Sequence, residues 1–346
     1  MNLPISLNPS PLPTRFPLVT AKDLLTEQLQ QWAFSDTEPA HGAKRILRLE
    51  VPIADCSPLQ WLSWQDHPTQ LYWSNRNNTF EMAGIGIADK IQCDGTNHYG
   101  QVLSQIQHVL SGHEGKARYY GGMRFDPDAA VDEHWRCYGT CFFILPRCEV
   151  VSDSTGSYFA CNLVINDHKK LPWAWDEWAA VRTQGKLADS SNPVPLRRHD
   201  NPDQAQWERN LETALATLNS GDIDKIVLSR STTLQFENRP QAALLLQRLK
   251  EIEPIAYHFY IQPQPQCAFI GATPERLYKR RGRVLHSEAV AGTCPRGKTL
   301  REDGLLGDTL LHSDKEYREH KWCVTKFRPC CETIAGLSRS TLICAC

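Results

Sequence analysis

The sequence predicts an α+β fold in which antiparallel sheets are flanked by helices. Segments with the alternating apolar pattern of strands outnumber segments with helical spacing. Several neighbouring strand segments are separated only by tight polar turns, which join antiparallel strands, whereas parallel strands need a crossover of about a dozen residues. The 346 residues are enough for one large domain or two ordinary ones with a buried core.

The first half of the chain is predicted to contain two helices and a series of strands. Apolar residues at helical spacing indicate helices at 24–34 and 96–112, and the second ends at Gly112. Alternating or continuous apolar runs indicate strands, with the polar turn 75–78 between two of them. The predicted strands are 45–53, 71–76, 81–91, 117–127, 140–152 and 157–166.

Residues 186–203 form the best internal boundary, because they are polar, hold three prolines and have no periodicity. We therefore expect an N-terminal α+β part at 1–185, a linker at 186–203 and a second part at 204–322. The elements predicted after the linker are a helix at 204–221, strands at 225–236, 256–262 and 267–272, a helix at 240–252, a hairpin at 276–292 and a helix start at 311–324.

The composition excludes several classes of protein. Lys and Arg number 38 against 39 Asp and Glu, a formal net charge of −1, which argues against binding dominated by nucleic acid or by an anionic membrane. No apolar run approaches the length of a membrane span, and no secretory signal pattern is present. We expect a cytoplasmic protein whose 13 cysteines are not normally used as disulfides.

Motifs for several common chemistries are missing from the sequence. The cysteines do not form a CxxC…CxxC array, and no HExxH is present, so a structural zinc site is not expected. GxGxxG and GxxxxGK[ST] loops are also missing, as is a nucleophile elbow. The common dehydrogenase, kinase and hydrolase interpretations therefore have no support.

Polar residues at strand ends and turns of the second half are the candidate site. Lys225 opens an apolar strand, Glu275 follows an apolar strand and Pro274, and Thr293 lies in a glycine-containing turn. Glu319 lies one turn inside a helix whose N-cap is predicted at Ser313. Taken singly, each of these residues has an ordinary interpretation. Lys225 can be a snorkelling lysine, Glu275 a solvated carboxylate in a turn, Thr293 part of an ordinary hairpin, and Glu319 an exposed helix glutamate.

Taken in order, the segments around these residues resemble the chorismate-utilising enzyme family, most closely isochorismate synthases of the menaquinone type. Four ordered blocks carry the resemblance, and more loosely matching segments lie upstream. The four blocks are 225–230, 269–277, 287–297 and 313–320, and the upstream segments are 71–76, 120–127 and 142–150.

The resemblance implies an α+β enzyme that binds chorismate through Mg²⁺. By motif position, Lys225 would be the general base that activates water for attack at C2 of the ring, and Glu275 the acid that protonates the departing C4 hydroxyl. Glu319 would be a Mg²⁺ ligand, and Gly292 and Thr293 would line the substrate pocket. These residue types suit the reaction, because water is a poor nucleophile and hydroxide a poor leaving group.

Two positions narrow the expected activity. Lys225 together with Ala291 resembles the branch of the family that uses water, which contains isochorismate synthases and salicylate synthases. The four blocks do not separate these two, nor a menaquinone pathway from a siderophore pathway. A non-catalytic chorismate-binding protein remains a further alternative.

Beyond Trp322 the sequence departs from the family pattern. The family continues with an amphipathic helix that carries acidic residues, whereas here Pro329 is expected to break the helix. The second Mg²⁺-binding glutamate that the resemblance implies is expected beyond the helix of Glu319 and is not found in this sequence. We expect residues 323–346 to be an aberrant tail that follows a disruption of the coding frame, with an unusual short paralogue as the alternative. Little or no activity is then expected of the 346 residues. The tail contains Cys323, Cys330, Cys331, Cys344 and Cys346.

Overall fold

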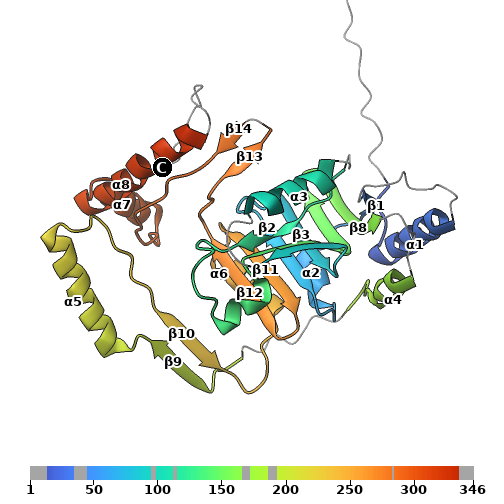
Figure 1. Cartoon of the computed structure of the whole chain (residues 1–346), viewed down its shortest axis with the longest axis horizontal. Helices are drawn as coiled ribbons and strands as arrows, with labels where there is room; N and C mark the ends of the chain where they lie inside the picture. The colour runs from blue at the N-terminus through green and yellow to red at the C-terminus, as the bar shows by residue number, and fades with distance from the viewer. Residues whose placement is uncertain are drawn as a thin grey trace, which may run out of the picture.

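A seven-stranded antiparallel sheet forms the centre of the structure, in strand order β1-β8-β7-β3-β2-β11-β12 (Figure 1). The computed structural model describes residues 14–34, 45–94, 99–111, 115–165, 172–185, 193–282 and 284–334. The strands are β1 (Arg45–Ile53), β2 (Gln70–Ser74), β3 (Phe80–Ile85), β7 (Cys148–Asp153), β8 (Gly156–Ile165), β11 (Tyr257–Gln264) and β12 (Cys267–Thr273).

Helices packed against the large sheet complete its core. These are α1 (Leu18–Phe34), α2 (Pro58–Ser63), α4 (Pro172–Ala180) and α6 (Ala242–Ile252). Aromatic rings fill the space between sheet and helices: Phe159 stacks on Trp178 at 5.6 Å between ring centroids and meets the fully buried Trp61 edge-on. Within the described ranges, no helix is both long and apolar enough to cross a bilayer.

A smaller three-stranded sheet has the order β4 (Asp89–Cys93), β6 (Cys141–Leu145), β5 (Tyr120–Met123). The predicted single strand at 140–152 is divided at Pro146 and Arg147 into β6 and β7, which belong to different sheets. Proline cannot donate to a strand ladder, and the buried Arg147 guanidinium donates to the carbonyl oxygens of Ile87 and Asn162. The helix α3 (Tyr99–Ser111) packs against β4 and β1.

The rest of the second half forms a separate group of elements beside the large sheet (Figure 1). Many of its apolar side chains are exposed, including Leu215 at 58% and Val227 at 79%. This group therefore has no closed apolar core of its own within the described residues. Its elements are β9 (Arg197–Asn201), α5 (Gln204–Ser220), β10 (Ser231–Gln235), β13 (Lys279–Arg281), β14 (Val284–His286), α7 (Leu300–Leu311) and α8 (Asp314–Ile334).

Two predictions differ from the structure around the linker. The predicted strand 225–236 is a strand only at Ser231–Gln235, because β9 is the strand beside it and reaches no further than that segment. The predicted linker 186–203 is irregular only in part, since 197–201 form β9, and 186–192 lie outside the described residues. The boundaries of the expected parts of the chain stay a prediction.

The predicted break at Pro329 is also wrong. Helix α8 continues from Asp314 to Ile334 and passes through this proline. A proline inside a helix removes one N–H donor and crowds one carbonyl, but it leaves the other hydrogen bonds of the helix available. Cys344 and Cys346 lie outside the described residues.

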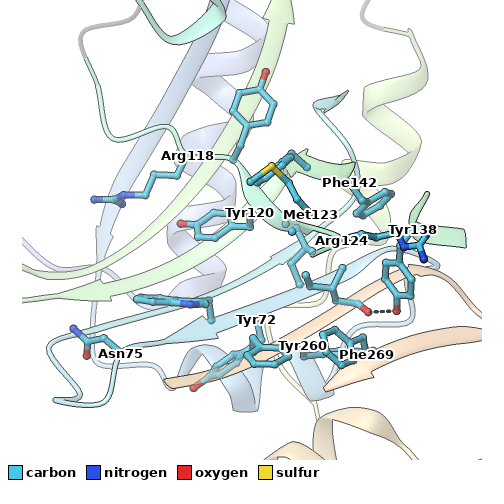
Figure 2. Close-up of a pocket in the computed structure, with 18 of the residues that line it drawn as sticks. Tyr72, Asn75, Arg118, Tyr120, Met123, Arg124, Tyr138, Phe142, Tyr260 and Phe269 are labelled. Atoms are coloured by element: carbon cyan, nitrogen blue, oxygen red, sulfur yellow. Dashed lines mark hydrogen bonds between the residues drawn. The ribbon is translucent and has the colours of Figure 1, made fainter. Parts of the chain in front are cut away.

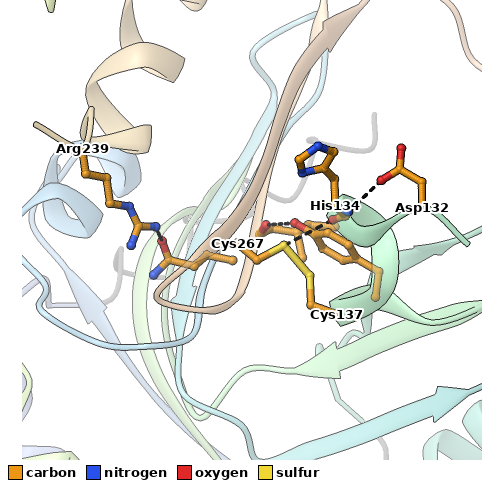
Figure 3. The surroundings of a disulfide bond; sticks show 8 residues. Asp132, His134, Cys137, Arg239 and Cys267 are labelled. Atoms are coloured by element: carbon orange, nitrogen blue, oxygen red, sulfur yellow. Dashed lines mark hydrogen bonds between the residues drawn. A yellow bond between two sulfur atoms is a disulfide. The ribbon is translucent and has the colours of Figure 1, made fainter. Parts of the chain in front are cut away.

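One pair of cysteines departs from the expectation of reduced thiols. The 3-10 helix η1 (Glu133–Tyr138) lies beside the start of β12, and Cys137 is disulfide-bonded to Cys267 (Figure 3). The contact follows from the fold, because ring contacts of Trp135 and Tyr138 with Phe269 hold η1 against β12. Among the described residues Cys56, Cys93, Cys141, Cys148, Cys161, Cys294 and Cys323 are free.

Candidate functional site

Lys225 faces helix α8. Its Nζ lies 3.5 Å from Glu319 Oε1 and 3.8 Å from Cys323 Sγ, and it sits 5.3 Å from the ring centroid of Trp322. The Lys225 side chain is only 26% exposed. The amine therefore points at a carboxylate and an aromatic ring on α8, which a lysine snorkelling into open solvent would not do.

The α8 side of this contact follows from helical spacing. Glu316, Glu319 and Cys323 are three and four residues apart, so they lie along one face of the helix. Ser313 begins the helix as predicted, because its Oγ accepts a hydrogen bond from the backbone N–H of Glu316 at 3.4 Å. The same face thus presents Glu319 to Lys225 and Glu316 to a neighbouring turn.

That turn contains Gly292 and Thr293. A β-carbon at position 292 would lie 3.0 Å from Glu316 Oε2, and the backbone there has φ +90°. Both features require glycine, since an L side chain would be strained and crowded. The structure thus brings the Gly292 turn to the same helix face as Lys225, while Thr293 itself is exposed.

Glu275 lies apart from these residues. It is exposed in the turn after β12, where its backbone N–H donates to Thr273 Oγ1 at 3.2 Å. Among the described residues the structure shows no contact between Glu275 and Lys225. The structure therefore brings together Lys225, Glu319 and the Gly292 turn, and leaves Glu275 on a neighbouring segment.

Three charged residues beside Glu275 were not singled out from the sequence. Arg76, Glu288 and Arg276, here called the Glu288 cluster, join three of the segments that carry the family resemblance. The Glu288 side chain is only 6% exposed. The sequence contains a partial signal for these residues, because oppositely charged residues end or adjoin apolar runs in these segments. No local pattern could pair Arg76 with Glu288, which lies 212 positions away.

The described residues offer limited ligands for a metal ion. No three His, Cys, Asp or Glu side chains among them lie together so that they could hold one. Mg²⁺ is commonly held by one or two carboxylates, with water and substrate oxygens as the other ligands. Glu319 on α8 is a half-buried carboxylate and fits as one such ligand. The described residues around it do not supply further carboxylate, histidine or cysteine ligands for a complete coordination shell.

A cavity away from these residues is lined by strands of the large sheet (β2, β11 and β12) and of the small sheet (β5 and β6) (Figure 2). Its volume is about 1180 Å³, and aromatic rings with a few cationic groups line it, among them Tyr120, Arg124 and Phe269. Tyr138 donates to the Ile261 carbonyl oxygen at 3.1 Å, and burial raises the pKa of Tyr138 to about 12. None of the five sequence-predicted site residues lines this cavity.

Comparison with known proteins identifies similar sequences. A family model described as "Chorismate binding enzyme" matches residues 28–340, a range that includes 323–340, where the sequence was expected to leave the family pattern. Isochorismate synthase MenF of Escherichia coli is 28% identical over 314 residues, which cover 88% of this chain and 65% of the relative. The salicylate biosynthesis isochorismate synthase of Pseudomonas aeruginosa is 28% identical and covers 83% of this chain and 62% of its own length.

The solved structures include a similar fold. The structure of MenF, the menaquinone-specific isochorismate synthase from Escherichia coli, matches with a TM-score of 0.75 and 26% sequence identity, over 90% of this chain and 68% of that one. This likeness confirms the predicted α+β fold with antiparallel sheets. The chain spans less than two thirds of the length of the curated relatives named above.

Proposed function

Because the chain belongs to the family of chorismate-binding enzymes, we propose that it converts chorismate into isochorismate. The observation that carries the proposal is the Lys225–Glu319 contact at 3.5 Å, within a chain whose family match runs from 28 to 340. A lysine amine and a carboxylate on two different segments meet at the positions where the sequence motifs place a base and a metal ligand. The names of the relatives support isochorismate as the product.

In the proposed reaction, Lys225 and Glu275 move protons. Lys225 Nζ takes a proton from water as the water oxygen bonds to C2 of the ring. The ring double bond shifts, the C4–O bond breaks, and Glu275 gives its proton to the leaving hydroxyl, which departs as water. One base and one acid thus solve the two problems of a poor nucleophile and a poor leaving group.

The remaining predicted residues would bind rather than transfer protons. The Gly292 turn, with Thr293, offers backbone N–H groups that can receive a substrate carboxylate. Glu319 would hold Mg²⁺, which when bound supplies a positive charge for the carboxylates of the substrate. The proposal for this ion rests on the residue type and the position of Glu319.

The proposed turnover is slow. Glu275 is exposed, and Lys225 is about a quarter exposed (26%). A site open to water weakens every electrostatic interaction inside it. An assay must therefore detect a small amount of product after long incubation.

The test is incubation of the purified chain with chorismate and Mg²⁺, followed by chromatography with mass detection. We expect isochorismate, and no isochorismate from Lys225→Ala. Salicylate released together with pyruvate would instead indicate a salicylate synthase. Chorismate binding without any product, measured by calorimetry, would indicate a non-catalytic binding protein.

The place of the reaction in metabolism is also proposed. The likeness to the menaquinone-specific MenF of Escherichia coli supports a role in menaquinone biosynthesis, whereas the name of the Pseudomonas aeruginosa relative supports salicylate biosynthesis as the alternative. We propose menaquinone biosynthesis in the cytoplasm, with a small-molecule substrate as the partner, because the balanced charge of the sequence argues against nucleic acid or an anionic membrane as a partner. Loss of menaquinone from a strain that lacks the gene, together with cell fractionation, tests both statements. Menaquinone at the normal level would contradict the first.

A further inference from the structure

The Glu288 cluster holds together the backbone on both sides of Glu275. Arg76 binds Glu288 through both ends of its guanidinium, with Nη2 2.6 Å from Oε1 and Nη1 2.8 Å from Oε2. The same Arg76 Nη1 donates to the carbonyl oxygen of Pro274 at 3.0 Å. Arg276 Nη2 lies 2.6 Å from Glu288 Oε1. The residues before and after Glu275 are thus both tied to one buried carboxylate.

The geometry of the cluster is typical of a rigid support. Paired guanidinium–carboxylate bonds fix orientation as well as distance, and a buried charge that loses its partner is strongly destabilising. Tyr257 of β11 adds to the packing: its ring lies 5.6 Å from the Arg76 guanidinium carbon, and its hydroxyl accepts from Arg276 Nη1 at 3.4 Å. Glu288 therefore has little freedom to move.

Glu288 also connects the two turns of the proposed site. It lies four residues before Gly292, so the carboxylate that holds the Glu275 turn begins the segment that reaches Glu316 on α8. Resting on the proposed function, we propose that Glu288 is a positioning residue, which fixes the Glu275 turn relative to the Gly292 turn. It acts on the reaction through Glu275 and does not itself touch the substrate.

The cluster has an electrostatic consequence as well. Its charged groups are the guanidiniums of Arg76 and Arg276 and the Glu288 carboxylate, and Tyr257 is the other titratable group packed against it. Replacing Glu288 by glutamine removes the charge that both guanidiniums share, so the bonds that hold Arg76 and Arg276 in place are weakened.

The experiment compares Glu288→Gln with Glu149→Gln in the full chain. Glu149 is the matched control, because it is equally buried and bound to Arg48, but it lies on β7, four strands away from β12. Hydrogen exchange measured by mass spectrometry reports the geometry without any need for activity. We expect faster exchange in 273–277 and 287–293 for Glu288→Gln and unchanged exchange there for Glu149→Gln.

Enzyme kinetics distinguish a positioning role from a purely structural one, because a positioning residue affects kcat and leaves KM nearly unchanged. For Glu288→Gln we expect kcat to fall about 100-fold with KM changed little, as for a small misplacement of a reacting group. Glu288→Asp, which keeps a carboxylate for both guanidiniums, should lose less of kcat than Glu288→Gln.

The outcomes separate this inference from the proposed function. Faster exchange in both segments together with a wild-type chain that makes no isochorismate supports the positioning geometry and overturns the proposed function. Unchanged exchange in both segments overturns the inference. An active wild type with an unchanged kcat in Glu288→Gln overturns it as well, whatever the exchange rates.

Discussion

Lys225 is the residue on which the proposed chemistry depends most. Its amine contacts both Glu319 and the Trp322 ring, so it is held against one position on the surface of α8. The sequence predicted Lys225 and Glu319 separately, through a family resemblance. Their contact across 94 positions of the chain could not be predicted, because nothing local in either segment encodes it.

Replacement of Lys225 by alanine should lower turnover by at least about 100-fold, because a positioned general base contributes this much or more. Isochorismate formation measured at saturating chorismate checks this. Lys298→Ala, which alters an exposed lysine, should retain turnover. Equal loss in both variants would contradict the role of Lys225.

His258 provides a pH-dependent prediction about stability. It is fully buried on β11, and burial, followed by the nearby Lys250 ammonium, lowers the pKa of His258 below its ordinary value. The unfolded chain therefore binds the proton at a higher pH than the folded chain. The stability that His258 contributes is present above about pH 6.5 and is lost as the pH falls through the folded-state value.

The free energy of unfolding, measured by urea titration between pH 7.5 and 5, checks this. His258→Gln should show a smaller loss of stability on acidification than the wild type, whereas His199→Gln, at an exposed position, should follow the wild type. Identical pH slopes for His258→Gln and the wild type would contradict the argument.

At the level of elements, apolar periodicity predicted most of the central sheet. The strands β1, β2, β8, β11 and β12 were predicted because they alternate or run apolar into a core. The division of 140–152 at Pro146 was missed, although proline is the signal for it. Residues 225–230 were predicted as part of a strand and are not one, for another reason. A strand needs a hydrogen-bonded partner, and β9 pairs only with Ser231–Gln235 of β10.

The Gly292 turn gives a prediction at this scale. Gly292→Ala should destabilise the chain by about 1 kcal/mol through its positive φ and should further displace Glu316. Gly221→Ala is the matched control, because that glycine also has a positive φ, of +78°, but has nothing within 4 Å of its β-carbon position. Thermal unfolding and chorismate affinity of both variants check this, and equal chorismate affinity would contradict a role of the turn in binding.

At the scale of the whole molecule, the sheet core is closed and the candidate site is open. The fold class could be predicted from strand patterns and turns, and the structural likeness to MenF confirms it. Lys225 and the Gly292 turn meet the face of α8 that carries Glu316 and Glu319. This contact depends on long-range packing, which sequence patterns do not contain. The disulfide Cys137–Cys267 was missed for the same reason, since its partners are 130 residues apart.

Removal of Mg²⁺ should act on turnover and not on folding. The described residues contain no preformed cage for an ion, so a chelator should leave the unfolding temperature unchanged. The same chelator should abolish isochorismate formation, and added Mg²⁺ should restore it. A fall in the unfolding temperature on chelation, or turnover that persists, would contradict this assignment of Glu319.

The most direct test of the proposed reaction is the oxygen isotope of the product. The chain is incubated for a long time with chorismate and Mg²⁺ in water enriched in oxygen-18, and the product is measured by mass spectrometry. We predict isochorismate that carries one oxygen-18 atom, at the C2 hydroxyl, and none from Lys225→Ala. Isochorismate without the label, or labelled product formed equally by Lys225→Ala, would contradict water attack assisted by Lys225.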